Sequence, residues 1–111
     1  DEMHSNFKRA FSVNSIAGEY GMTELMSQAY AVKDGIYAAP NWMRVSAREI
    51  NDPLSKPIVN KHGALNIIDL ANLHSCSFIA SSDLGKVYSD GTFEVLGRID
   101  HSDTRGCNLL V

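Results

Sequence analysis

The chain has 111 residues, 44% of them apolar and 21% charged, and carries a formal net charge of −3 at pH 7. A chain of this length makes one compact domain, and its ten scattered basic residues argue against a nucleic-acid-binding protein. No apolar run reaches the roughly 18 residues that a membrane span needs, and neither the cysteines nor the histidines have metal-ligand spacing. We therefore expect residues 1–111 to form a single cytoplasmic domain without a zinc site.

The first fifth of the chain predicts a short helix followed by a strand. Phe7 and Phe11 stand four residues apart in the polar stretch 1–11, which is the spacing of one helix face. The apolar run 13–20 is typical of a buried strand, and Gly21 allows the backbone to turn after it.

A second helix and a hairpin are predicted next. Thr23 is a suitable N-cap for a helix over 24–30, and Glu24 in the first turn would favour the helix dipole. Residues 31–39 predict a hairpin around the Asp-Gly pair at 34–35, because Asp-Gly is well suited to a tight turn.

The middle of the chain predicts a half-buried strand, a loop and another strand. Apolar and polar residues alternate over 42–50, which is the two-residue period of a strand with one buried face. Arg44 and Arg48 fall on the polar face, so we expect them to be solvated or paired surface charges. Prolines and polar residues over 51–63 indicate a loop, and the apolar run 64–73 indicates a strand.

The last third of the chain predicts a short strand and a hairpin. The stretch 77–80 favours a strand, and the runs 86–88 and 92–96 flank a second Asp-Gly pair at 90–91. All these elements together predict an α+β chain that is mostly β, with one or two short helices.

Two charged residues border this hairpin, and hairpin geometry predicts that they meet. Asp83 precedes the first strand and Arg98 follows the second, and antiparallel pairing brings the two ends of a hairpin side by side. A carboxylate that accepts from a diol and a guanidinium that donates to a sugar or phosphate would suit a nucleotide. Considered alone, the pair is more typical of a turn-capping Asp and a surface ion pair, so both interpretations stay open.

Several short motifs resemble those of the adenylate-forming enzymes, a superfamily of acyl-CoA synthetases, peptide-synthetase adenylation domains and luciferases. That family has Thr-Gly-Asp-Leu-Gly, Asp-Gly and Gly-Arg-x-Asp in this order. Here residues 81–85, 90–91 and 97–100 are Ser-Ser-Asp-Leu-Gly, Asp-Gly and Gly-Arg-Ile-Asp. Upstream, Glu-Tyr-Gly-Met-Thr-Glu at 19–24 resembles the family's Tyr-Gly-x-Thr-Glu. The resemblance implies a small distorted antiparallel β-barrel or sheet, as part of such an enzyme.

The resemblance also implies a nucleotide site. Asp83 and Arg98 would hold the ribose of ATP, and Tyr20 would pack on the adenine. Thr23 would contact a phosphate, and Glu24 would bind Mg²⁺, for which a carboxylate is a suitable hard ligand. The plainer alternative for Thr23 and Glu24 is the helix start described above.

One branch of the superfamily is most similar to this chain. The sequence of residues 19–30 and the Asp-Leu-Ala-Asn-Leu at 69–73 resemble the corresponding sequences of the acyl-protein synthetases of bacterial bioluminescence. These enzymes activate a fatty acid with ATP and pass the acyl group to a cysteine near their C-terminus, where Cys107 stands here. Cys107 would then be the thiol acceptor, although the apolar residues 109–111 favour a buried small side chain. Asp100 would be the interdomain hinge.

Two parts of the family's enzymes have no counterpart in these 111 residues, namely the glycine-rich phosphate loop and the lysine-bearing C-terminal lid. We therefore interpret the chain as the C-terminal part of a nucleotide-binding domain and expect it to be inactive alone. One alternative is a non-catalytic β-barrel module that binds a partner or an acyl chain. Another is a fragment that forms a homodimer through an exposed apolar surface.

Overall fold

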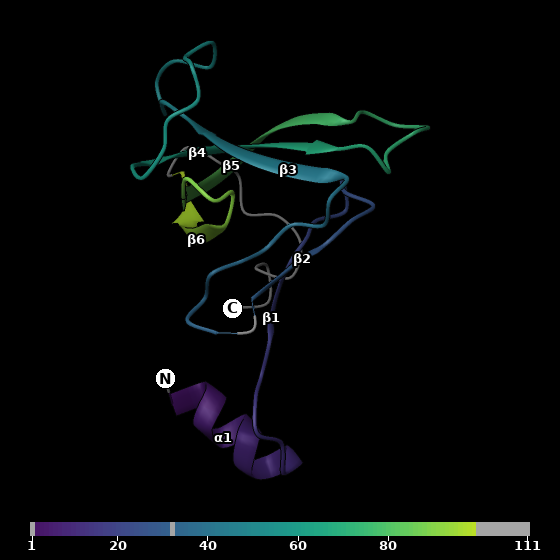
Figure 1. Cartoon of the computed structure of the whole chain (residues 1–111), viewed down its shortest axis with the longest axis vertical. Helices are drawn as coiled ribbons and strands as arrows, with labels where there is room; N and C mark the ends of the chain where they lie inside the picture. The colour runs from purple at the N-terminus through teal and green to yellow at the C-terminus, as the bar shows by residue number, and fades with distance from the viewer. Residues whose placement is uncertain (1, 32, 100–111) are drawn as a thin grey trace.

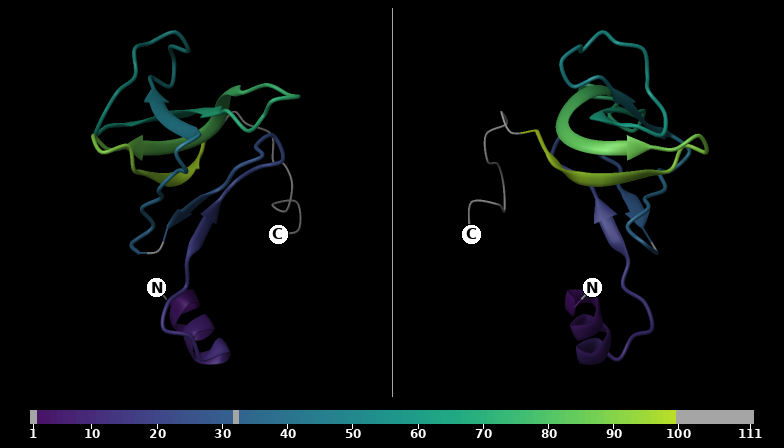
Figure 2. Two further views of the ribbon diagram at one scale, coloured as in Figure 1. Left: turned by 45° about the vertical axis from the view of Figure 1, so that its right-hand side comes forward. Right: turned by 90° about the vertical axis from the view of Figure 1, so that its left-hand side faces the viewer.

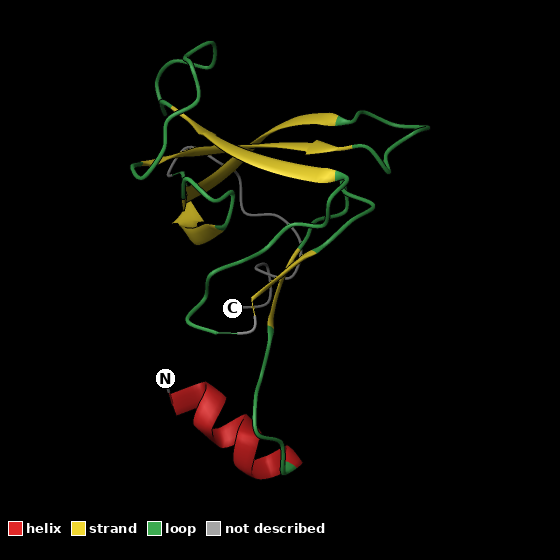
Figure 3. Cartoon of the chain, viewed as in Figure 1, coloured by secondary structure: helices red, strands yellow, loops and turns green. Residues whose placement is uncertain are grey.

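The computed structural model describes residues 2–31 and 33–99, which form one helix and two sheets (Figure 1). The elements are α1 (Glu2–Phe11), β1 (Gly18–Tyr20), β2 (Ala29–Ala31), β3 (Met43–Arg48), β4 (His62–Asp69), β5 (Phe78–Val87) and β6 (Phe93–Arg98). β1 and β2 form an antiparallel pair, and β3 to β6 form a four-stranded antiparallel sheet in chain order. Strands outnumber the helix (Figure 3), which confirms the prediction of an α+β chain that is mostly β.

The four-stranded sheet is an open meander in the described part of the chain. Because β3 and β6 lie at its two ends, the sheets do not close into a barrel in these residues. Of the two expected forms, barrel or sheet, the structure shows the open sheet. Single bridges extend the two edges: Ile58 pairs with Ala47 of β3, and Tyr37 pairs with Phe93 of β6. Figure 2 shows that β5 bends strongly, as expected for a strand with register irregularities toward both neighbours.

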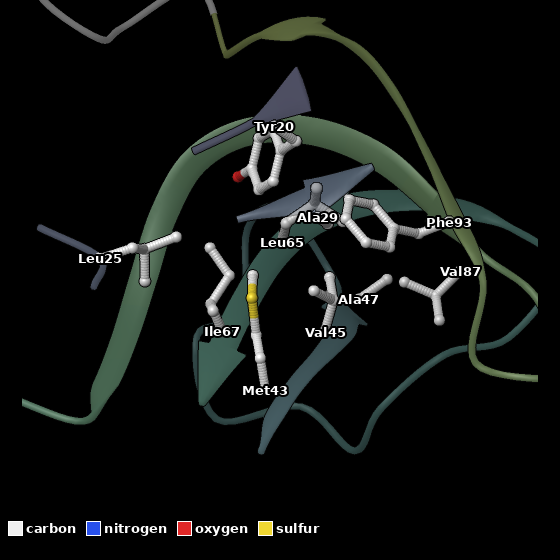
Figure 4. Close-up of a cluster of buried hydrophobic side chains, with 10 residues drawn as sticks. All are labelled: Tyr20, Leu25, Ala29, Met43, Val45, Ala47, Leu65, Ile67, Val87 and Phe93. Atoms are coloured by element: carbon white, nitrogen blue, oxygen red, sulfur yellow. The ribbon is translucent and has the colours of Figure 1, made fainter. Parts of the chain in front are cut away.

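The core lies where one face of the four-stranded sheet packs against the segment that carries β1 and β2 (Figure 4). Along β3 the side chains alternate, so Met43, Val45 and Ala47 are buried, as predicted. The buried cluster consists of Tyr20, Leu25, Ala29, Met43, Val45, Ala47, Leu65, Ile67, Val87 and Phe93. Leu65 and Phe93 are completely buried.

Gly85 lies where β5 passes close to β4 and β6. A Cβ at this position would meet the carbonyl oxygen of Glu94 and the side chain of Leu65. The register between β5 and β6 also shifts at this point of the strand. A side chain here would push β6 away from the core, so glycine is the residue that fits.

Helix α1 stands apart from the sheets (Figures 1 and 2) and buries none of its residues. Its apolar side chains Met3, Phe7 and Phe11 follow the four-residue spacing of one face, which confirms the predicted helix. The helix ends because Ser12 adopts a left-handed φ of 53°, and the Val13 N–H donates back to the Lys8 carbonyl at 3.1 Å. None of the described helical residues form a segment long and apolar enough to cross a membrane.

Both predicted Asp-Gly hairpins are confirmed. Asp34 and Gly35 have φ angles of 58° and 67°, the pair of left-handed residues that a type I′ turn requires. At the β5–β6 turn, Gly91 has a φ of 86° and its N–H donates to the Tyr88 carbonyl at 3.0 Å. The Tyr88 N–H donates to the Thr92 carbonyl at 2.8 Å, which closes the hairpin.

Two local predictions are wrong. The helix over 24–30 is absent: a loop leads instead to β2, and the Asp69 side chain of β4 binds the N–H groups of Met26 and Ser27 in this loop. The strand predicted over 13–20 is limited to β1, and residues 13–17 are largely exposed. Arg48, which was predicted to be solvated or paired, is paired by hydrogen bonds, since its guanidinium reaches across the sheet to the carbonyls of Leu65 and Ser81.

Candidate functional site

Asp83 and Arg98 lie opposite each other on β5 and β6, as predicted from the hairpin. Arg98 Nη1 is 3.8 Å from Asp83 Oδ1. The Asp83 side chain is 12% exposed and that of Arg98 is 40% exposed, so the carboxylate is recessed while the guanidinium reaches solvent. Asp83 lies within the long strand β5 rather than in a loop before it, which gives the carboxylate a rigid support.

The second carboxylate oxygen of Asp83 is bound by a residue of the core. Tyr20 of β1 donates its hydroxyl to Asp83 Oδ2 at 2.7 Å. Burial, followed by this bond to a carboxylate, raises the pKa of Tyr20 above its usual range, so the phenol keeps its proton and remains a donor. One oxygen of Asp83 is thus fixed by Tyr20 and the other faces Arg98.

The Tyr20 ring, which is predicted to pack on adenine, is enclosed by aromatic side chains in this structure. The residue is 8% exposed, and its ring makes edge contacts with Phe93 at 5.4 Å and with Tyr37 at 6.0 Å between centroids. A ring so enclosed offers no open face for stacking on a base. The adenine role of Tyr20 remains a prediction, and in this structure its hydroxyl binds Asp83.

The main chain of β5 is also held close to Asp83. The Ser81 hydroxyl donates to the Leu65 carbonyl at 2.9 Å and accepts the N–H of Asp83 at 3.2 Å. Beyond β6, the Ile99 N–H donates to the Ser82 carbonyl at 2.8 Å, so the pairing continues past Arg98. The carboxylate consequently has a fixed position, which is what recognition of a vicinal diol by an acceptor requires.

Thr23 and Glu24 lie in a tight turn that follows β1. The turn is closed by the Leu25 N–H, which donates to the Met22 carbonyl at 3.1 Å. Both side chains are exposed, and the Thr23 hydroxyl donates to Glu24 Oε2 at 3.1 Å. They are accessible to a ligand, but their predicted roles at phosphate and Mg²⁺ remain predictions.

Glu24 can contribute to a magnesium site only together with other ligands. Within residues 2–31 and 33–99, no group of three or more His, Cys, Asp and Glu side chains could hold a metal ion. Mg²⁺ is usually bound by one or two carboxylates together with substrate phosphates and water. A single exposed carboxylate therefore fits Mg²⁺ that arrives with a nucleotide.

A buried polar cluster beside this turn was not singled out from the sequence as a site. Asp69 and Asn72, which are 0% and 2% exposed, bind the loop between β1 and β2. Asp69 accepts hydrogen bonds from the N–H and hydroxyl of Ser27 at 2.8 Å each. Asn72 Nδ2 donates to the Glu24 carbonyl at 2.8 Å. The Asp-Leu-x-Asn pattern at 69–72 is the sequence feature that could have indicated this cluster.

An apolar groove of about 610 Å³ adjoins the same loop. Its lining includes Met26, Tyr30, Trp42 and Ala71, and the first three side chains are at least half exposed. The Trp42 ring is fixed at the edge of the groove because its Nε1 donates to the Ser27 hydroxyl at 2.8 Å. The groove could accommodate an apolar chain next to the Thr23–Glu24 turn.

Two predicted residues lie outside the described part of the chain. Asp100, the predicted hinge, and Cys107, the predicted thiol acceptor, follow the last described residue. Both assignments remain predictions. Cys76, by contrast, is described and is an exposed free thiol.

Comparison with known proteins identifies the fold. No model of a known family matches the chain, and no curated protein matches its sequence. Similar solved structures include a benzoate CoA ligase from Burkholderia xenovorans LB400 (18% identity, TM-score 0.60) and the O-succinylbenzoate coenzyme A synthetase MenE from Bacillus subtilis, in complex with AMP (19%, 0.61). A third is a luciferase-like enzyme from the nonluminescent mealworm Zophobas morio (18%, 0.60).

These similarities extend over 87% to 88% of this chain but only 23% to 30% of each solved chain. The chain thus has the fold of one segment of these enzymes, as the resemblance of its motifs predicted. It spans less than a third of the enzymes that it resembles.

Proposed function

We propose that the chain is the ribose-binding segment of an ATP-dependent acyl ligase, a cytoplasmic enzyme that activates a carboxylic acid and passes its acyl group to a thiol. The observation that carries this proposal is the arrangement of Asp83 between the Tyr20 hydroxyl and the Arg98 guanidinium. The fold supports it, because the similar structures include two CoA-ligating enzymes and a luciferase-like enzyme.

Each residue of this group has a task that suits its chemistry. Asp83 accepts hydrogen bonds from the two ribose hydroxyls, for which a carboxylate has enough lone pairs. Tyr20 keeps one carboxylate oxygen in place, and this reduces the entropy lost when the sugar binds. Arg98 donates to the sugar or an adjacent phosphate through its exposed guanidinium.

The turn after β1 serves the phosphate end of the nucleotide. Thr23 donates its hydroxyl to a phosphate oxygen, and Glu24 binds the Mg²⁺ that accompanies ATP. ATP supplies the adenylyl group that makes the acid reactive toward a thiol. The residues of this chain hold and orient the nucleotide, while the remaining walls of the site belong to a longer enzyme.

The acyl substrate is an apolar carboxylic acid, such as a fatty acid. Support comes from the groove lined by Met26, Tyr30 and Trp42, because Met26 belongs to the same loop as Thr23 and Glu24. Cys107 is the proposed thiol acceptor within the chain. If another thiol accepts the acyl group, replacing Cys107 with serine will leave acyl transfer in the full enzyme unchanged.

The groove also supports a second candidate, a non-catalytic module that binds an acyl chain or a partner protein. Such a module needs the apolar groove but not Asp83 or Arg98. Binding of a fatty acid without any binding of AMP would favour this candidate. The homodimer stays a prediction, which sedimentation of the isolated chain would test.

Calorimetric titration with AMP tests the proposed function. We expect saturable binding to the 111-residue chain and a loss of affinity of about tenfold or more in Asp83→Asn, because a charged acceptor is replaced by a neutral amide. The matched control is Asp52→Asn, an exposed carboxylate in the loop before β4. No binding to the unaltered chain, or equal losses in both variants, would contradict the proposal.

A further inference from the structure

The loop between β1 and β2 is held by side chains from a distant part of the chain. Met22 to Gln28 form no helix or strand, and the exposed turn at Thr23 and Glu24 belongs to this loop. A loop without regular hydrogen bonding keeps one conformation only if other groups bind its main chain. Asp69 and Asn72, at the end of β4 and just beyond it, provide those groups.

Asp69 binds the loop through its carboxylate. Oδ2 accepts the N–H groups of Met26 at 3.1 Å and Ser27 at 2.8 Å, and Oδ1 accepts the Ser27 hydroxyl at 2.8 Å and the Ala71 N–H at 3.0 Å. The residue is completely buried. A buried carboxylate is tolerated because these four donors replace the water that it loses.

Asn72 binds the peptide groups on both sides of Leu25. Its Nδ2 donates to the Glu24 carbonyl at 2.8 Å, and its Oδ1 accepts the Met26 N–H at 2.9 Å. Nδ2 also donates to the Cys76 carbonyl at 2.9 Å, which ties the amide to the β4–β5 connection. The peptide that carries the Glu24 carbonyl is thereby fixed to the β4–β5 connection.

We propose that Asp69 and Asn72 are positioning residues that hold the Thr23–Glu24 turn in the orientation in which it meets the phosphate end of a nucleotide. The functional half of this inference rests on the proposed function. Neither residue touches the nucleotide, because both are buried under the loop. They act through the main chain of Glu24 and Met26.

The chain contains a natural reporter of this loop. Trp42 is its one tryptophan, and Trp42 Nε1 donates to the hydroxyl of Ser27, which itself donates to Asp69. Movement of the loop therefore changes the hydrogen bonding and exposure of the indole. Tryptophan emission measures the position of the loop without any ligand.

The structural half of the proposal is tested by amide hydrogen exchange on the 111-residue chain. In Asn72→Ala we expect exchange at Met26 to accelerate about tenfold relative to Ile67 of β4, together with a shift of the Trp42 emission. Ser77→Ala is the matched control, because its hydroxyl donates to the Asn72 carbonyl at 3.1 Å without touching the loop. Ser27→Ala is a milder second variant should Asn72→Ala not fold.

Two outcomes would overturn the structural half: equal acceleration at Met26 and Ile67, which means general destabilisation, or no change at Met26. The functional half is tested by comparing affinities for Mg-ATP and for adenosine. We expect Asn72→Ala to weaken Mg-ATP binding about tenfold and to leave adenosine binding unchanged, because the turn serves only the phosphates. Equal effects on both ligands would overturn it, whereas absence of all nucleotide binding would reject the proposed function and leave the exchange result standing.

Discussion

The Tyr20 hydroxyl donates a hydrogen bond of 2.7 Å to Asp83 across 63 residues of sequence. This bond joins β1 to β5, and Tyr20 also packs its ring edge against Phe93 of β6. The orientation of the candidate ribose-binding carboxylate therefore depends on the packing of the core. Core and site form one unit, so substitutions in either affect the other.

Tyr20→Phe removes this bond while keeping the ring. Asp83 loses a partner in a recessed position, so we expect the free energy of unfolding to fall by about 1–3 kcal/mol. AMP affinity should fall as well, because the carboxylate becomes free to rotate. Urea unfolding and calorimetry measure the two effects. Tyr37→Phe, whose ring stacks on the same Phe93, is the control and should retain its AMP affinity.

Asp69 makes stability depend on pH in the acid range. Burial opposes its charge, but hydrogen bonds from Ser27, Ala71 and Met26 outweigh this and hold the pKa of Asp69 below its usual range. A carboxyl whose pKa is lowered by folding stabilises the protein above its unfolded pKa of about 3.9. That stability is lost as the pH falls through the lower pKa of the folded state.

Asp69→Asn is therefore expected to be less stable than the unaltered chain at pH 7, with a difference that narrows below about pH 4. Urea unfolding from pH 2 to pH 7 measures this difference. Asp52→Asn, in an exposed loop, should show little change across the range. A constant difference between Asp69→Asn and the unaltered chain would contradict this account of the carboxylate.

Phe93 is the largest completely buried side chain in the described part of the chain. Phe93→Ala should lower the free energy of unfolding by about 3–5 kcal/mol, since it removes buried surface and leaves a cavity under Tyr20. The same substitution at Phe78, which is 69% exposed at the start of β5, is the control and should cost far less. Similar losses at both positions would mean that the core is placed incorrectly.

Gly85→Ala tests the close passage of β5 and β6. The added methyl group meets the Glu94 carbonyl and Leu65, so we expect a loss of about 1–3 kcal/mol from overpacking. Ser82→Ala, on the same strand, should change stability by less. Thermal unfolding of the two variants gives the comparison, and an unchanged midpoint for Gly85→Ala would rule out the close contact.

The sequence predicted correctly those turns and strands whose conformation is determined by neighbouring residues. The Asp-Gly pairs at 34–35 and 90–91 require only the φ angles of their own residues, and the alternation along β3 requires only one buried face. The meeting of Asp83 and Arg98 followed from the second hairpin, because antiparallel pairing fixes which residues are opposite.

The remaining features depend on contacts between distant parts of the chain. Residues 24–30 have a helix-like start, yet Asp69 and Asn72 bind the N–H groups of Met26 and Ser27, more than forty residues before them in sequence. Tertiary hydrogen bonds thus overrode the helix propensity. The burial of Tyr20 depends likewise on a ring contact with Phe93, which no local pattern indicates.

The central claim is that Asp83 recognises the ribose hydroxyls of a nucleotide. The most direct measurement compares the affinities of adenosine and 2′,3′-dideoxyadenosine for the unaltered chain and for Asp83→Asn. We expect adenosine to bind about tenfold tighter than the dideoxy compound to the unaltered chain, and this preference to disappear in the variant. Equal binding of the two nucleosides to the unaltered chain, or a preference that survives in Asp83→Asn, would contradict the claim.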